Sequence, residues 1–192
     1  MSYSKYLDVI QYKRQLLKKL ISEEENIHEI SNVIFYALKK GKKIMLCGNG
    51  GSAADAQHLA AEFLVRLRPK INRKPLAAIS LAQDTSTITA CGNDYKFDDI
   101  FSRNLRALGK KGDILLAIST SGNSSNIIKV LKEAKRMNIK TISLLGANGG
   151  FAKKLSQFKI IVPSSITARI QEMHIFLGHY IFECIENLIL KK

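Results

Sequence analysis

The sequence contains few cysteines and no paired cysteine motif. Cys47, Cys91 and Cys184 lie far apart along the 192 residues, and no C-x-x-C pair occurs. We therefore expect neither a disulfide framework nor a zinc knuckle, and we interpret the three cysteines as small buried residues.

Long hydrophobic runs are also missing. No stretch approaches the roughly 20 apolar residues that a membrane helix requires, so we expect no membrane contact. The opening stretch, MSYSKYLDVIQYKRQ, lacks the apolar segment of a signal peptide, which predicts a cytoplasmic protein. With 46% hydrophobic residues, a chain of this length can form one sizeable α/β domain but is short for two.

Acidic residues are few relative to basic ones, and the formal net charge is +14. Such a charge fits either nucleic-acid binding or a field that attracts anionic substrates. The lysines and arginines are spread along the whole chain, and we find no zinc finger, RRM signature or concentrated basic arm. Direct nucleic-acid binding is therefore not expected, although one substrate phosphate does not require so large a charge.

Apolar residues repeat with helical spacing near the start of the chain. The spacing predicts one helix over residues 5–21. Ser22 with Glu25 resembles a capping box that opens a second helix, and Gly41 ends that helix as a C′ residue.

Five short, mostly continuous apolar runs follow, which are KIMLC, LAAISL, DILLAIS, KTISLL and FKIIVP. Continuous runs of this length are typical of parallel strands buried on both faces. Helix-compatible segments separate them, at about 52–67, 94–108, 124–137 and 150–156. This alternation predicts βαβ units and an α/β fold.

The segment from Thr167 to the end of the chain predicts a long helix that is apolar around most of its girth. Such a helix must be buried on most sides, either against another subunit or against the N-terminal helices. We predict a single domain over residues 1–192. It comprises N-terminal helices (1–40), an α/β core (43–163) and a C-terminal helix (167–191).

Two loops carry the chemistry of an anion site. The first is Gly48–Ser52, within CGNGGSAADAQHLAAE, and the second is Ser119–Ser124, which reads STSGNS. Glycines expose backbone N–H groups, hydroxyls add donors, and the start of the following helix contributes positive dipole. Ser124 or Asn123 could instead merely cap a helix. Two such loops at equivalent positions of βα units favour a phosphate site.

The first loop also fits the G-x-G-x-x-A spacing of a dinucleotide-binding turn. That fingerprint requires an acidic residue about 20 residues further on, at the end of the second strand. Asp84 lies more than 30 residues beyond Gly51, and neither loop ends in Gly-Lys-Ser/Thr. We therefore expect neither NAD binding nor a Walker A site.

Polar side chains that could move a proton follow the first loop. His58 and Glu62 are four residues apart and share one helix face with Asp55 and Arg66. A solvated helix face is the alternative interpretation. Because this helix starts directly from the proposed phosphate loop, its first turns should border the ligand.

The last helix supplies Gln171, Glu172, His174 and His179. Gln171 and His179 lie about 12 Å apart along the axis. They can converge on one ligand only from two sides of it or from different subunits. Histidine, glutamate and glutamine suit Zn²⁺, although a histidine in an apolar helix is more often a core residue.

Cys91–Asp94 reads as a loop before a helix, and its Asn93 and Asp94 are candidate polar contacts or caps. Together, the two loops and the polar side chains predict a phosphorylated small-molecule ligand and acid–base chemistry.

Four segments, in this order and spacing, resemble the phosphoheptose isomerases: CGNGGSAADAQHLAAE, GNDYKFDDIFSR, GDILLAISTSGNS and ARIQEMHIFLGH. Members of that family consist of a single sugar-isomerase (SIS) domain. The resemblance covers nearly the whole chain after the first helix. It implies a three-layer α/β/α fold with a five-stranded parallel sheet, and a homotetramer with active sites at subunit contacts.

The resemblance also assigns functions to individual positions. It implies that Glu62 and His179 are the catalytic acid–base pair and that Zn²⁺ is bound by His58, Glu62, Gln171 and His179. It places the substrate against Asn49, Gly50, Gly51, Ser52, Glu62, Asn93, Asp94, Ser119, Thr120, Ser121, Ser124 and Gln171. Ala168 replaces an aspartate of some members, and VRL around Arg66 replaces a common Gly-Arg-Tyr, so neither position is assigned.

The activity that the resemblance implies is an aldose–ketose isomerisation. Sedoheptulose 7-phosphate would become D-glycero-D-manno-heptose 7-phosphate through an enediol or enediolate, as the first step towards ADP-heptose and lipopolysaccharide or another glycan. The alternative is a non-catalytic SIS tetramer that binds the replication initiator DnaA. That relative lacks equivalents of Glu62 and His179 and has an arginine within the second loop, so the sequence favours the isomerase.

Overall fold

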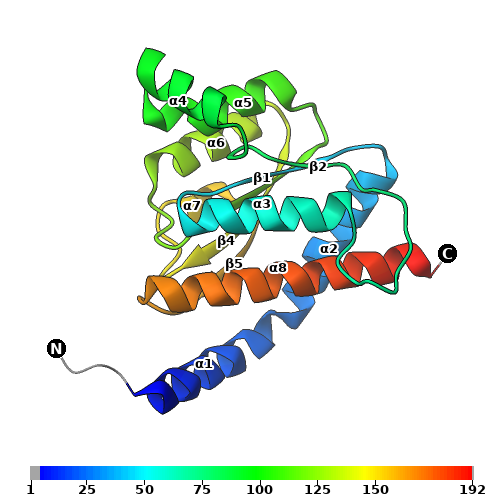
Figure 1. Ribbon diagram of the computed structural model, residues 1–192, viewed down its shortest axis with the longest axis vertical. Helices are drawn as coiled ribbons and strands as arrows, with labels where there is room; N and C mark the ends of the chain where they lie inside the picture. Colours follow the sequence, from blue (N-terminus) through cyan, green and yellow to red (C-terminus); the bar gives the residue numbers. More distant parts are fainter. Residues whose placement is uncertain (1–4, 192) are drawn as a thin grey trace.

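Five parallel strands form the central layer of the computed structural model, which describes residues 5–191 (Figure 1). The strands are β1 (Ile44–Cys47), β2 (Ala78–Ser80), β3 (Ile114–Ser119), β4 (Lys140–Gly146) and β5 (Phe158–Val162). Their order in the sheet is β2-β1-β3-β4-β5. Each apolar run of the sequence therefore forms a strand, and the predicted five-stranded parallel sheet is confirmed.

Helices cover both faces of this sheet. On one face lie α2 (Glu24–Lys39), α3 (Gly51–Leu64) and α8 (Thr167–Leu190); on the other lie α4 (Thr85–Asp94), α5 (Ile100–Leu108), α6 (Ser125–Arg136) and α7 (Ala152–Leu155). Successive strand residues point to opposite faces, so Leu46 and Leu116 enter the first core while Met45 and Leu115 enter the second. Two-sided burial explains why the strands lack polar alternation.

The prediction that Ser22 and Glu25 form a capping box at the start of α2 is wrong. A 3₁₀ turn, η1 (Ile21–Glu23), joins α1 (Tyr6–Leu20) to α2, and Ile21 keeps helical backbone angles. Because the chain stays helical there, α2 has no free N-terminus to cap, and the Ser22 hydroxyl donates to the Lys19 carbonyl instead (3.1 Å). Gly41 has a φ of +69°, which confirms it as the residue that ends α2.

Helix α4 is not among the predicted helices, and the interpretation of Cys91–Asp94 as a loop is wrong. These residues form the last turn of α4, and η2 (Phe97–Asp99) and α5 replace the single helix predicted over 94–108. β-Branched residues and a glycine in TSTITACGND lower helix propensity and hide the helix. Asp84 is its N-cap and accepts a hydrogen bond from the Ser86 N–H (3.0 Å), which gives this residue a structural role.

Neighbouring helices bury α8 only in part. It packs against α2 and α3, yet Phe176 and Tyr180 remain exposed, and a hollow of about 400 Å³ separates this surface from α1. No helix within residues 5–191 is long and apolar enough to cross a membrane. Cys47 and Cys91 are buried as predicted, whereas Cys184 on α8 is only half-buried.

The strand order creates a switch point between β1 and β3. From β1 the chain moves to β2 on one side, and from β3 it moves through β4 to β5 on the other. Loops that leave two such strands diverge and open a crevice at the carboxyl edge of the sheet. The loops that follow β1 and β3 are the two predicted anion loops.

Candidate functional site

An asparagine pair joins the two loops across the switch point. Asn49 in the first loop and Asn126 in the first turn of α6 each donate an amide hydrogen to the other's carbonyl oxygen, both at 2.8 Å. Asn126 is buried, and Asn49 is half-buried. The reciprocal bonds fix the spacing of the loops, so their donors face one crevice.

The first loop needs its glycines for close approach. A Cβ on Gly48 would lie 2.4 Å from the Ser52 carbonyl oxygen, and a Cβ on Gly51 would lie 2.4 Å from Nε2 of Gln171. Gly50 has a φ of +54° and precedes α3, which has no side-chain cap. Gln171 of α8 therefore lies directly over the start of α3, where an anion would bind.

The second loop is held by the loop that follows β4. Gly122 has a φ of +66°, and a Cβ there would lie 2.1 Å from the Gly149 carbonyl oxygen. The Ser119 hydroxyl accepts from the Gly122 N–H (3.1 Å). Ser124 occupies the N-cap position of α6 without a side-chain hydrogen bond to the helix, and Asn123 accepts from the Phe151 N–H (2.9 Å). The interpretation of Ser124 or Asn123 as a simple cap is therefore wrong.

Two histidines and a glutamate meet between α3 and α8. These helices lie side by side (Figure 1), and their contact is close because a Cβ on Gly178 would lie 2.6 Å from a methyl group of Leu59. Nε2 of His58 lies 2.9 Å from Nε2 of His179, and the Glu62 carboxylate lies 3.6 Å from Nε2 of His58. Glu62 and His179, the predicted catalytic pair, therefore both approach the same ring nitrogen of His58.

This arrangement favours an uncharged His179. Burial lowers the pKa of its ring, the neighbouring His58 lowers it further, and Glu62 and Glu183 oppose this only in part. Burial also raises the pKa of Asp55, which lies one turn before His58 on α3, although His58 opposes the rise. A neutral imidazole near a carboxylate can accept a proton at neutral pH, as acid–base catalysis requires.

Gln171 does not join the two histidines within one chain. It lies at the start of α3, beside Gly51, whereas His179 lies two helical turns further along α8, beside His58. Within residues 5–191, no group of three or more His, Cys, Asp or Glu side chains is arranged to hold a metal ion. Of the four predicted zinc ligands, the structure brings together His58, His179 and, less closely, Glu62.

The remaining predicted contacts lie further out. Asn93 and Asp94 are exposed at the end of α4, where the Asn93 amide donates to the Asp94 carboxylate (2.8 Å). In the part of the chain that the structure describes, no hydrogen bond joins either residue to the two loops. Arg66 is exposed just beyond the end of α3.

A buried ion network at the end of α3 was not predicted. Glu186 of α8 accepts from Arg68 (2.9 Å) and from Arg73 (2.8 Å), whose guanidinium also donates to the Glu62 carbonyl (2.6 Å). Burial raises the pKa of Glu186, but the two arginines outweigh it and the net shift is downward. The network holds the backbone of Glu62, and a lone glutamate within the apolar segment CIENLIL was its only sequence signal.

His174 is buried in the core next to this site, and its chemistry predicts a pH effect on stability. The side chain is fully buried, and burial lowers the pKa of His174 to about 4, although an interaction with the Leu145 backbone opposes the shift. An unfolded histidine titrates near 6.5, so between these values the unfolded chain binds the extra proton. The contribution of His174 to stability is therefore complete well above pH 6.5 and is lost as the pH falls towards 4.

We expect the free energy of unfolding to fall by about 2 kcal/mol between pH 8 and pH 5 because of His174 alone. Urea unfolding of the wild-type protein and His174→Gln at both pH values measures the effect. Between pH 8 and pH 5 the free energy of unfolding of the variant should fall by about 2 kcal/mol less than that of the wild type. Equal decreases would contradict the proposed pH effect of His174.

The chain is similar to SIS-domain proteins and to known phosphoheptose isomerases. The family model of the SIS domain matches residues 6–146, which include both loops and α3. Phosphoheptose isomerases from Helicobacter pylori (strain P12) and Clostridium acetobutylicum are 48% and 50% identical to the chain. The first match covers 94% of this chain and 93% of that protein, and the second 85% and 82%.

Solved structures agree with this relationship. The phosphoheptose isomerase GmhA from Neisseria gonorrhoeae is 42% identical with a TM-score of 0.84, covering 95% of both chains. The enzyme from Francisella tularensis is 34% identical with a TM-score of 0.86, covering 95% of this chain and 99% of that one. The chain therefore belongs to the phosphoheptose isomerase family of SIS-domain proteins, and it is an isomerase.

Proposed function

We propose that the protein interconverts sedoheptulose 7-phosphate and D-glycero-D-manno-heptose 7-phosphate. One observation carries this proposal. Two loops rich in hydroxyl and N–H donors lie at the switch point, and the Asn49–Asn126 pair fixes their spacing. Helix α3 begins at the first of these loops, and its His58 and Glu62 lie close to His179 of α8. An anion cradle next to an acid–base cluster suits a phosphorylated sugar whose reacting end reaches the helices.

The reaction needs a proton to move between adjacent carbons. A base takes a proton from C1 of the ketose, and the electrons form the C1–C2 double bond of an enediol while O2 gains a proton. The proton is then returned to C2 as O1 loses its hydrogen, and C1 becomes the aldehyde. We assign Glu62 and His179 to these transfers, because both lie beside His58 where α3 meets α8.

We propose Zn²⁺ as the cofactor. Two imidazoles and a carboxylate are a donor set that zinc prefers, and the 2.9 Å between the His58 and His179 nitrogens is close to the roughly 3.3 Å of a tetrahedral zinc site. His58, Glu62 and His179 would hold the ion, with Gln171 as the fourth predicted ligand. When bound, zinc would polarise the carbonyl and stabilise developing negative charge.

We further propose a cytoplasmic homotetramer. The exposed Phe176 and Tyr180 on α8 support contact with another subunit. Because Gln171 and His179 of one chain are two turns apart, Gln171 of a neighbouring subunit could complete the metal site. Free thiols at all three cysteines fit a reducing compartment.

The DnaA-binding alternative has less support. The catalytic side chains that distinguish an isomerase, Glu62 and His179, are present and face a common neighbour. Capture of DnaA by this protein, together with no turnover of sedoheptulose 7-phosphate, would favour that alternative.

An NMR assay in D₂O tests the proposed reaction. The purified protein should convert sedoheptulose 7-phosphate to the heptose, and the product should carry deuterium at C2, because the enediol is protonated from exchangeable sites. A product that carries at C2 only the hydrogen that was on C1 of the ketose, with no deuterium, would instead indicate a direct hydride shift from C1 to C2. Fructose 6-phosphate serves as the comparison substrate, and faster turnover of it would point to another sugar-phosphate function.

A further inference from the structure

A group of exposed lysines lies at the edge of the sheet opposite the proposed active site. In a parallel sheet every connection from a helix into a strand ends at the amino edge. These connections here are rich in lysine and arginine, most of them exposed. We define the amino-edge basic face as Lys39, Lys40, Lys42, Lys110, Lys111, Lys135, Lys140 and Lys154.

Backbone contacts hold these connections against one another. The Ile114 N–H donates to the Lys43 carbonyl, the Gly112 N–H to the Asn138 carbonyl and the Lys140 N–H to the Asp113 carbonyl, at 3.0–3.1 Å. A Cβ on Gly112 would lie 3.1 Å from the Lys42 side chain, so the stem of Lys42 packs over the neighbouring connection. Lysines that are more than a hundred residues apart in sequence, such as Lys39 and Lys154, therefore share one surface.

Acidic residues do little to neutralise this face. Asp113 is buried and pairs with Lys43 (2.5 Å), and Glu133 pairs with Arg136 (2.6 Å). Among residues 5–191, no ion pair within 4 Å involves any lysine of the amino-edge basic face. The surplus is therefore available to an external polyanion, and its distance from the substrate loops argues against a role in steering the substrate.

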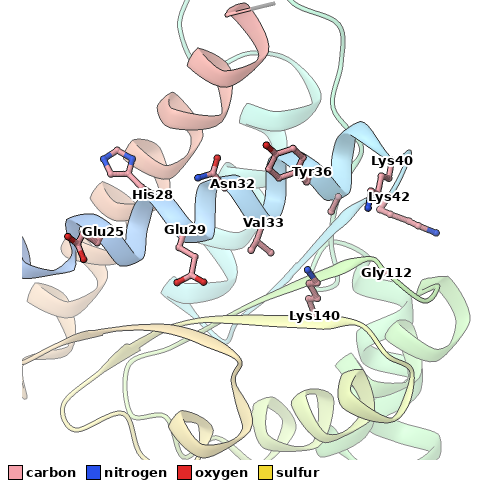
Figure 2. A pocket seen from close by; sticks show the side chains of 11 residues that line it. Glu25, His28, Glu29, Asn32, Val33, Tyr36, Lys40, Lys42, Gly112 and Lys140 are labelled. Atoms are coloured by element: carbon pink, nitrogen blue, oxygen red, sulfur yellow. The ribbon is translucent and has the colours of Figure 1, made fainter.

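Two hollows meet on this face. A cavity of about 620 Å³ is lined by Tyr36, Lys40, Lys42 and Lys140, and a second of about 450 Å³ is lined by Lys135, Lys140 and Lys154. Lys140 borders both hollows, which are therefore neighbours, and we refer to the pair as the basic groove. Figure 2 shows Glu25 and Glu29 at the far end of α2 from Lys40, with Lys140 on the strand opposite. The acidic end repels an anion, so the favourable path runs from Lys40 across Lys140 to Lys154.

We propose that the amino-edge basic face binds a single strand of nucleic acid. A basic groove suits the phosphate backbone, and Tyr36, whose side chain is 54% exposed in the same groove, offers a ring on which a base can stack. A flat lipid surface would use neither the groove nor the ring. From the sequence we expected no nucleic-acid contact because the charges are dispersed along the chain, and the fold brings them together.

Fluorescence anisotropy with a dye-labelled 20-nucleotide uridine strand tests the proposal on the full protein. Lys40→Gln with Lys140→Gln should weaken binding about 25-fold at 0.1 M salt and reduce the salt slope by about 1.4, because each lost phosphate contact changes it by about 0.7. Lys18→Gln with Lys19→Gln, on α1, is the control with the same loss of charge, and its affinity should stay near that of the wild type.

A second variant separates stacking from charge. Tyr36→Ala should weaken binding about 5-fold or more while leaving the salt slope unchanged. Equal weakening in both lysine variants, or no binding of the uridine strand, would overturn the proposal. Binding to vesicles of phosphatidylserine but not to the uridine strand would overturn it in favour of a lipid. Isomerase activity of all variants should remain at the wild-type level, which keeps this test independent of the proposed function.

Discussion

Replacement of Glu62 by glutamine is expected to lower kcat for sedoheptulose 7-phosphate by about 10³-fold. The substitution keeps the size of the side chain but removes a group that can take and return a proton, and positioned acid–base groups contribute about 10²–10⁴-fold to rates. The Glu62 carboxylate is only 18% exposed and lies beside His58, so water cannot easily replace it. Steady-state kinetics, with circular dichroism to verify folding, measures the effect.

Glu183→Gln is the matched control for this experiment. Glu183 lies one turn beyond His179 on the same helix and also raises the pKa of His179 through its charge, but it is not a predicted contact of the substrate. We expect its kcat to stay within about 3-fold of the wild type. A Glu62→Gln protein that folds and keeps full activity would remove Glu62 from the acid–base pair.

Removal of metal is expected to abolish most of the activity, by about 10²-fold or more. Stabilisation of developing charge by a bound ion is worth several kcal/mol, and each 1.4 kcal/mol corresponds to about a tenfold change in rate. Protein treated with a zinc chelator and then dialysed should regain activity when one equivalent of Zn²⁺ per chain is added. Full activity of the metal-free protein would show that the reaction does not need the ion.

Metal content provides an independent measurement for the proposed ligands. His58→Gln should lower the zinc content, measured by mass spectrometry of the digested protein, well below that of the wild type. His28→Gln is the control, because His28 is an exposed histidine on α2 that lies 3.9 Å from Glu24. Unchanged zinc content in His58→Gln would place the metal elsewhere.

The predictions of the fold were most accurate where local sequence dictates packing. Strands buried on both faces produce continuous apolar runs, so all five were identified, and glycine at position 41 marked the end of α2. The predictions failed where tertiary context overrides propensity. The helix α4 contains β-branched residues and is stabilised by the Asp84 cap and by packing against α5, and Ser22 has no free helix end to cap.

The candidate site was predicted by residue type but not by its internal geometry. Residues with polar side chains at strand ends identify the loops, and four-residue spacing places His58 and Glu62 on one face. The partner of Asn49, namely Asn126, could not be predicted, because no local pattern encodes a pair 77 residues apart. For the same reason, the hydrogen bond from Arg73 to the backbone carbonyl of Glu62 could not be predicted.

By itself, the sequence determined the α/β class, the positions of the two glycine- and serine-rich loops and the family to which the chain belongs, since these depend on short-range patterns and on residue identity. Only the tertiary structure decided that β1 and β3 are neighbours, that His58 meets His179 while Gln171 stays at Gly51, and that dispersed lysines form one basic face. These features depend on the order of the strands and on the close packing of α3 against α8. Both arise from contacts between residues far apart in the chain, whose pairing the local sequence does not encode.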